Sequence, residues 1–434
     1  MKRRVIEVVE GSPLRDLTPS EQADFRRART DLERRLRPRR LPFEDAAQGP
    51  VPRNIIGTVT LNSRTQIRVL PKVQNGADWI RACLDLMIPE RASVAGNRRA
   101  SRRAAQPSLE SGLAVIYRER LTRALRSEGL IEVIHEEYAL SDSLTGHLDV
   151  ERWVMGRAMR ELTFPVHRPV LDANNDFTAT LAMACTVLAR SVDDGATRSA
   201  LFKIARDLRP GLAQPTATNH AVLAQRLPSQ WSAFDNAWSI AQVVLANSGF
   251  ASRHGLLSGV EVALEPWVLL EELLDRTVRH VVSRARSLGL DWRCERQATV
   301  QLLDPVEPGN GALTRLLSPR VAHPENLIVG PEGVVASFEA KYSRPNGPAQ
   351  IRSHMYQLLT AAAHAGSPCA VLVYPELAAP IHWTTASGRT SVRDVYAVGL
   401  DLFGYTAVDG CGARVETILE MILPREGVQA PSED

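Results

Sequence analysis

The spacing of hydrophobic positions changes repeatedly along the chain, and each change predicts an element. Apolar residues three and four apart indicate helices, whereas alternation or a short apolar run indicates strands. One helix also begins at a capping box, Thr18-Pro19-Ser20-Glu21. Helices are predicted over residues 19–36, 79–87, 109–126, 176–207, 229–248, 264–287, 351–365 and 414–423. Strands are predicted over residues 55–61, 65–70, 323–329, 334–342, 370–374 and 392–403, with strand or loop pieces over 131–138 and 146–150.

The order of these elements predicts an α/β (α+β) multidomain protein. The chain has 434 residues, which exceeds one ordinary domain and suits two or three. We expect a helix and a β-rich domain over residues 1–105 and a mostly helical middle region over 106–250. The last part, 251–434, has the order helix, strand, strand, helix, strand, which predicts an α/β core.

Composition indicates a folded protein of the cytoplasm. Hydrophobic residues make up 44% of the chain, but no apolar run approaches the roughly 18 to 20 residues of a membrane span. The basic start Met1-Lys2-Arg3-Arg4 is followed by alternating acids, so we expect no signal peptide and no membrane partner. Without a Cys-x-x-Cys pair, neither a disulfide framework nor a zinc site is indicated. The cysteines are Cys83, Cys185, Cys294, Cys369 and Cys411.

Arginine supplies most of the positive charge. A net charge of +3 is too small to indicate a polyanion partner by itself. Arginines gather at residues 26–29, 34–40 and 97–103. These clusters are either solvated helix faces and loops or contacts to phosphate groups, which guanidinium groups bind in a bidentate way.

Residues 323–342 form the most informative stretch. A Gly330-Pro331-Glu332-Gly333 turn separates two strand-like runs, with Glu325 on the first and Glu339 and Lys341 on the second. Alternation puts Glu339 and Lys341 on one face. A turn centred between Pro331 and Glu332 places Glu325 opposite Phe338 or Glu339. Two carboxylates and an ammonium would then form a divalent-metal site of the kind that attacks phosphodiesters.

Lysine is rare in this chain, which makes Lys341 informative. The only lysines are Lys2, Lys72, Lys203 and Lys341. The alternative for Glu339 and Lys341 is an exposed ion pair on a sheet surface, worth about 0–1 kcal/mol. Glu325 could likewise cap a strand, and Lys72 is either a phosphate or partner contact or half of a structural pair.

The helix before this hairpin offers a third acid. At about 100° per residue, Glu271 falls on the apolar stripe with Trp267 and Leu274, while Glu272 falls toward arginines on the wet face. A buried carboxylate is costly without a partner, and a metal ion or a lysine would serve. The alternative is a partly solvated helix glutamate.

Glu271, Pro324-Glu325, Glu339-Ala340-Lys341 and Tyr356-Gln357 follow one another on helix, strand, strand and helix. This ordered set resembles the PD-(D/E)xK nuclease superfamily. The resemblance implies a nuclease core over residues 251–434, with Glu271, Glu325, Glu339, Lys341 and Gln357 as site residues. His323 and His354 lie near these motifs but are expected to be incidental.

A narrower resemblance covers roughly residues 54–375. The chain is similar to the McrC family, the nuclease subunits of McrBC modification-dependent restriction systems. It departs from the family at Glu325, where an aspartate is usual, at His147 for an arginine, and at Ala361 for a tyrosine. The segments that carry the resemblance are Thr65–Val73 with Pro71-Lys72-Val73, Tyr138 with Gly146-His147-Leu148-Asp149, Phe164 through Asp176, Leu269-Leu270-Glu271, Glu339-Ala340-Lys341-Tyr342 and Tyr356-Gln357.

The resemblance implies an endonuclease that uses Mg²⁺ (or Mn²⁺), held by Glu325, Glu339 and Glu271. It implies a separate AAA+ GTPase or ATPase ring as partner, engaged by the N-terminal domain, and modified double-stranded DNA as substrate. No G-x-x-x-x-G-K-[ST] motif occurs, so the chain itself is no nucleotide motor. The alternatives are an inactive McrC-like scaffold that stimulates its ring, indicated by Glu325 and Ala361, and an arginine-rich DNA-binding module without a ring.

Overall fold

The chain forms two compact units, residues 1–98 with 263–434, and residues 99–262. The predicted domain boundaries at 105/106 and 250/251 lie outside the described residues. The computed structural model describes residues 4–15, 17–36, 41–62, 64–73, 79–87, 108–158, 163–192, 194–211, 220–247, 263–303, 321–343, 347–376, 379–385, 390–406 and 411–423.

The N-terminal part of the first unit is a small sheet covered by a helix. The strand order is β1-β5-β4-β9, in which β1 and β5 are parallel and the other pairs antiparallel. Helix α1 begins at the predicted capping box: Thr18 N–H donates to Glu21 (2.9 Å), and Glu21 N–H donates to the Thr18 hydroxyl (3.3 Å). These elements are β1 Arg4–Val9, α1 Pro19–Leu36, β2 Phe43–Ala46, β3 Gly49–Pro52, β4 Ile56–Thr60, β5 Thr65–Leu70, α2 Trp79–Met87 and β9 Ala263–Leu264.

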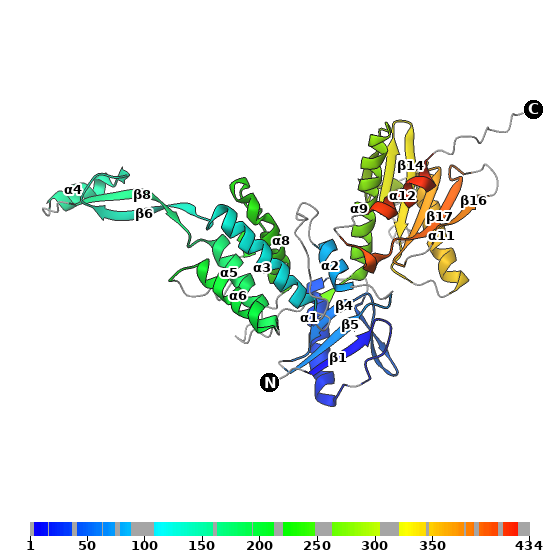
Figure 1. Cartoon of the computed structure of the whole chain (residues 1–434), viewed down its shortest axis with the longest axis horizontal. Helices are drawn as coiled ribbons and strands as arrows, with labels where there is room; N and C mark the ends of the chain where they lie inside the picture. Colours follow the sequence, from blue (N-terminus) through cyan, green and yellow to red (C-terminus); the bar gives the residue numbers. More distant parts are fainter. Residues whose placement is uncertain are drawn as a thin grey trace, which may run out of the picture. The chain divides into compact units, whose positions relative to one another are not determined.

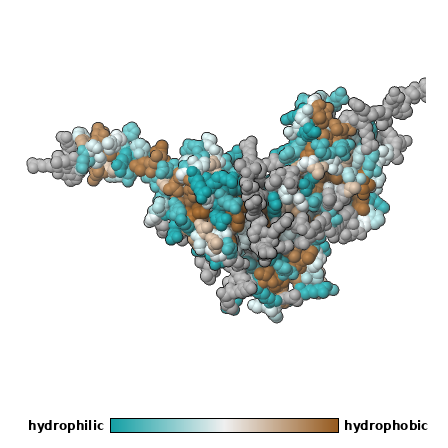
Figure 2. Space-filling view, in the orientation of Figure 1, coloured by the Kyte–Doolittle hydropathy of each residue, from teal (hydrophilic) through white to brown (hydrophobic). Residues whose placement is uncertain are grey.

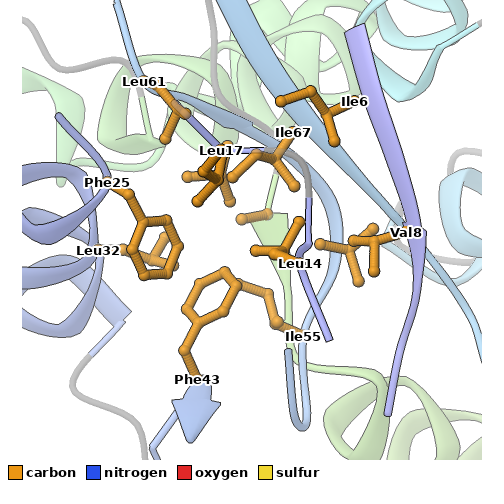
Figure 3. Packing of buried hydrophobic residues seen from close by; sticks show 13 residues of the cluster. Ile6, Val8, Leu14, Leu17, Phe25, Leu32, Phe43, Ile55, Leu61 and Ile67 are labelled. Atoms are coloured by element: carbon orange, nitrogen blue, oxygen red, sulfur yellow. The ribbon is translucent and has the colours of Figure 1, made fainter. Parts of the chain in front are cut away.

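Apolar side chains of the helix and the sheet meet in one core (Figure 3). Phe25 of α1 packs edge-on against Phe43 of β2, with ring centroids 5.0 Å apart. Ile67 of β5 is fully buried beside them. Ala263 belongs to the same core and follows the second unit in sequence, so this sheet is closed by residues far apart in the chain.

The C-terminal part of the first unit is a six-stranded mixed sheet, ordered β10-β13-β14-β15-β17-β16. The three strands β14, β15 and β17 are parallel, and antiparallel strands flank them. Figure 1 shows this sheet with its long helices α9 and α11. The elements are α9 Pro266–Ser287, β10 Arg293–Arg296, β11 Val300–Gln301, β12 Val321–Ala322, β13 Asn326–Gly330, β14 Gly333–Ala340, α11 Pro348–His364, β15 Cys369–Tyr374, β16 Ile381–Thr384, β17 Asp394–Gly399, η3 Leu402–Gly404 and α12 Gly412–Ile422.

The second unit joins a helical bundle to an arm of three strands and a helix (Figure 1). Helix α5 is buried along most of its length, and Tyr117 of α3 donates to the Leu181 carbonyl (2.8 Å) in the bundle interior. The arm has the strand order β6-β8-β7. The elements are α3 Leu109–Glu128, β6 Val133–Ser141, β7 His147–Leu148, α4 Val150–Ala158, β8 Phe164–Asp172, α5 Asp176–Ser191, α6 Gly195–Asp207, α7 His220–Leu223, η2 Ser229–Phe234 and α8 Asp235–Asn247.

The mixed α/β class and the predicted hairpins are confirmed. The helix predicted over 176–207 is two helices, because α5 ends at Ser191 and Asp194 caps the start of α6. The helix predicted over 229–248 begins with the short 3-10 helix η2 before α8. The strand predicted over 392–403 is shorter than expected, because Asp401 adopts a left-handed conformation (φ 46°) and begins η3. In the part of the chain that the structure describes, no helix combines the length and apolar run that crossing a membrane requires.

Arg276 joins α9 to α2 by capping the end of α2. Its guanidinium donates to the carbonyls of Asp85 (3.0 Å) and Leu86 (2.7 Å), and to Glu272 (2.9 Å). Carbonyls in the last turn of a helix have no partner within the helix. Because the Arg276 side chain is only 5% exposed, it satisfies these carbonyls away from water.

Replacing Arg276 by methionine is expected to lower the free energy of unfolding of this unit by about 3 kcal/mol, since buried acceptors and Glu272 lose their donor. Urea denaturation followed by circular dichroism measures the change. The matched control is Arg284→Met, because Arg284 and its partner Glu416 are 52% and 55% exposed. The control should change stability by less than about 1 kcal/mol. Equal effects of both substitutions would contradict the assignment.

Candidate functional site

A β-bulge in the hairpin shifts the register of β13 against β14. Next to the turn, Gly330 pairs with Gly333 and Val329 with Val334, but beyond the irregularity Ile328 pairs with Ala336. The extra residue is Val335, and it shifts the register by one, so that Asn326 pairs with Phe338. Glu325 directly precedes β13, and its N–H donates to the Phe338 carbonyl (3.1 Å), which holds it beside the end of β14.

Glu339 and Lys341 lie on the same face of β14 and form a close ion pair. The Lys341 ammonium is 2.5 Å from Glu339 Oε1, and the two side chains are 20% and 15% exposed. Burial raises the pKa of the Glu339 carboxyl above its ordinary value, Lys341 opposes this rise, and the negative charge of Glu325 adds to it. The two carboxylates are therefore near enough to repel one another, and the ammonium compensates only part of their charge.

Glu339 occupies the face of the sheet that α11 covers. In the parallel pair of β14 and β15, Glu339 lies beside Leu372, and Lys341 N–H donates to the Val373 carbonyl (2.8 Å). Paired residues of neighbouring strands share a face. Leu372 packs in one cluster with Leu358 of α11. The opposite face carries Phe338 and Asn326 and lies against α9.

Helix α9 presents a buried acid that the helical phase did not single out. Asp275 is 1% exposed and accepts from Asn326 Nδ2 (3.0 Å), Arg279 (2.7 Å) and Arg296 (3.4 Å). Asp275 therefore neutralises Arg279 of α9 and Arg296 of β10, which is a structural role. The predicted site acid, Glu271, is half-buried one turn earlier on the helix. Glu272 binds Arg276, toward which its phase pointed, but Arg276 is buried and the predicted wet face is wrong at this position.

The expected supporting residues of α11 lie on its surface. Gln357 is exposed, and Tyr356 is 63% exposed. Instead, His354 of the same helix contacts the Tyr374 hydroxyl (3.1 Å), and Tyr374 ends β15 next to the Lys341 backbone. No periodic pattern of residues predicts this contact, because it joins a helix to the end of a strand.

The structure thus brings Glu325, Glu339 and Lys341 together. Among the described residues, no three His, Cys, Asp or Glu side chains lie close enough to hold a metal ion jointly, so Glu271 does not complete a three-acid group. Magnesium is commonly held by one or two carboxylates and keeps several waters. The mutually repelling pair Glu325 and Glu339 fits such an ion, because a divalent cation would relieve their repulsion.

The raised pKa of Glu339 predicts how stability depends on pH. The folded protein holds this proton more tightly than the unfolded chain, so the metal-free fold loses stability as pH rises through the range above the ordinary value of about 4.5. Glu339→Gln removes this contribution. The melting temperature of Glu339→Gln minus that of the wild type, in EDTA, should therefore grow from pH 4 to pH 7. A difference that shrinks with rising pH would contradict the expectation.

Comparisons with known proteins place these residues within one family. Residues 51–375 match the family described as "McrBC 5-methylcytosine restriction system component". A chain of the Thermococcus gammatolerans half-complex from a tetradecameric assembly of McrB AAA+ hexamers with bound McrC has a similar structure. Its TM-score is 0.66 at 13% identity, covering 95% of this chain and all of that one. A chain of the T. gammatolerans McrBC complex gives 0.50 at 14% identity, covering 64% and 88%. No curated protein matches.

Proposed function

The chain belongs to the McrBC family of restriction-system components, and from that premise we propose that it is a Mg²⁺-dependent DNA endonuclease subunit. Its substrate would be modified double-stranded DNA. The observation that carries the proposal is the cluster of Glu325, Glu339 and Lys341 at the end of β14, where Lys341 pairs with Glu339 and the charge of Glu325 acts on the same carboxyl.

Each side chain of the cluster has a separate task in this proposal. Glu325 and Glu339 would hold the metal ion, whose bound form supplies a water of lowered pKa and neutralises phosphate oxygens. Lys341, freed from part of its pairing when Glu339 turns to the ion, would donate to the phosphate and stabilise its developing negative charge. Leu372 beside Glu339 and the flank of α11 exclude water from one side of the cluster.

We propose a AAA+ ring as the partner, because the solved relatives are McrB hexamers in complex with McrC. The family resemblance implies that the N-terminal domain contacts this ring. The arm of the second unit supports a further contact, since it exposes large apolar side chains that a monomer gains nothing by exposing. Brown apolar patches are visible on it in Figure 2. The exposed apolar side chains of the arm include Ile134, Leu140, Leu144, Val150, Val154, Met155 and Leu171, each at least 57% exposed.

An alternative function is an inactive scaffold that stimulates the nucleotide hydrolysis of its ring. Glu325 favours it, because it stands where the related family has an aspartate and must retract its longer side chain to reach the same ion. The closeness of Glu325 to Glu339 supports the nuclease instead, since the negative charge of Glu325 raises the pKa of the Glu339 carboxyl.

One reconstitution separates these functions. The protein is mixed with the AAA+ protein encoded beside it, GTP or ATP, Mg²⁺ and a methylated plasmid. We expect nicking that requires every component and stops with EDTA. Stimulated nucleotide hydrolysis without any nicking would overturn the nuclease and favour the scaffold. DNA binding without co-purification of the AAA+ protein would indicate a DNA-binding module.

A further inference from the structure

A buried tyrosine directly follows the lysine of the site. Tyr342 is 8% exposed, and its position next to Lys341 puts it beyond the end of β14. Its hydroxyl donates to Glu10 Oε2 (2.9 Å), a residue that follows β1 of the N-terminal sheet. The strand that carries Glu339 and Lys341 is thus hydrogen-bonded to the small sheet at the other end of the sequence.

The Glu10 carboxylate accepts hydrogen bonds from several segments of the chain. Glu10 is 3% exposed, accepts from the Asn54 N–H (2.9 Å) through Oε1, and lies 3.5 Å from the Lys72 ammonium. Its own N–H donates to the Leu70 carbonyl at the end of β5 (2.8 Å). A carboxylate this deeply buried is costly unless it is paired and hydrogen-bonded, so these contacts hold the strand ends in a fixed arrangement.

Lys72 adds a second contact to the tyrosine. Its ammonium lies 4.5 Å from the centre of the Tyr342 ring, a cation–π distance. Lys72 therefore forms a structural pair with Glu10, which is one of the roles that its position in the sequence predicted. We call Glu10, Lys72 and Tyr342 the junction.

We propose that the junction positions Lys341 for the reaction and so couples the N-terminal sheet to the nuclease site. The backbone of Lys341 is fixed on one side by the Val373 carbonyl and on the other by the next residue, Tyr342, which Glu10 holds. A shift of the N-terminal sheet would pull on this segment and move the ammonium relative to Glu339. The proposal rests on the nuclease function for its consequence, whereas the mechanical link can be measured without it.

Tyr342→Phe removes the hydrogen bond to Glu10 and keeps the ring. Tyr117→Phe is the matched control, because it also removes a buried tyrosine hydroxyl, in the other unit and far along the sequence from the site. Both variants are made in the full chain and compared for melting temperature, hydrogen exchange of the Lys341 amide and nicking in the reconstituted complex at saturating Mg²⁺.

We expect both variants to melt at similarly lowered temperatures. In Tyr342→Phe alone, the Lys341 amide should exchange about 10-fold faster, and nicking should fall by roughly 10- to 100-fold, as for a reacting group misplaced by about 1 Å. Unchanged Lys341 exchange in Tyr342→Phe, or equal losses of nicking in both variants, would overturn the proposal. If the wild type does not nick, the nuclease function fails, and the exchange result still decides whether the junction holds Lys341.

Lys72 provides a second test through charge. Lys72→Arg keeps a cation over the ring and beside Glu10, whereas Lys72→Met removes it and leaves the buried carboxylate without its counter-ion. We expect Lys72→Met to accelerate exchange of the Lys341 amide and Lys72→Arg to restore most of the wild-type protection. Equal protection in the Met and Arg variants would show that the charge of Lys72 has no part in the junction.

Discussion

Glu339→Gln is expected to reduce plasmid nicking by the reconstituted complex on the order of 10³-fold, a loss typical of removing one essential charged group from a hydrolytic site. Glutamine keeps the size of the side chain but not its negative charge. The change removes one of the two facing carboxylates and the partner of Lys341. Initial nicking rates at saturating Mg²⁺ measure the effect.

The same hairpin supplies the control for this substitution. Glu332 is an exposed glutamate in the turn, at the far end of the hairpin from Glu339. Glu332→Gln changes the net charge equally and should leave the rate within about 2-fold of the wild type, as a surface charge away from the chemistry does. A loss in Glu332→Gln equal to that in Glu339→Gln would show that general charge, and not the site, controls nicking.

Glu325→Ala is expected to lower nicking on the order of 10²- to 10³-fold, because it removes the second carboxylate of the metal site. Glu325→Asp should retain activity within about 10-fold of the wild type, since the shorter acid is the one that the related family uses. The rates are compared across a Mg²⁺ titration, in which the weakened site of Glu325→Ala requires more metal.

The nicking rates of Glu325→Ala and Glu325→Asp, relative to the wild type, decide the role of Glu325. Equal rates for Glu325→Ala and the wild type would remove Glu325 from the site and leave Glu339 without a second acid. If both Glu325→Ala and Glu325→Asp were inactive, the length of the glutamate would be required, and the site would differ from the family pattern in geometry as well as in residue type.

Local elements were predictable because local chemistry specifies them. The capping box at Thr18 and Glu21 placed the start of α1 correctly, and helix α2 matches its predicted range. Weaker signals were missed. The strand β1 begins in a charged stretch, the hairpin of β2 and β3 lies in a segment with prolines, and the edge strand β16 is exposed along its length. None of these has a strong apolar period.

The site was predictable as a group of residue types but not in its exact register. Sequence alone left Phe338 and Glu339 as equal choices opposite Glu325. The bulge at Val335 changes the register so that Asn326 pairs with Phe338, and Glu325 donates its N–H to the Phe338 carbonyl. Bulges depend on packing on both faces of a sheet, which no residue pattern in the hairpin reveals. The helical phase predicted Glu271 as the inward-pointing acid of α9. The most buried acid of this helix is instead Asp275, which pairs with Arg279 of α9 and Arg296 of β10.

Contacts between distant segments were beyond sequence reasoning. Glu10 and Tyr342 are separated by most of the chain, and β9, which pairs with β4 of the N-terminal sheet, follows the whole second unit in the sequence. The scarcity of lysine singles out Lys72 in the sequence, but its partner Glu10 follows the distant strand β1. Such contacts arise from tertiary packing, and their value is that they connect the two sheets of the first unit.

The most direct test of the central claim is the nicking rate of the reconstituted complex with wild-type protein and with Lys341→Met. Methionine keeps the length and the apolar stem of lysine but carries no charge. We predict Mg²⁺-dependent nicking by the wild type and a loss on the order of 10³-fold in Lys341→Met, with ring binding unchanged. Equal nicking by the two proteins would contradict a reaction centred on Glu325, Glu339 and Lys341.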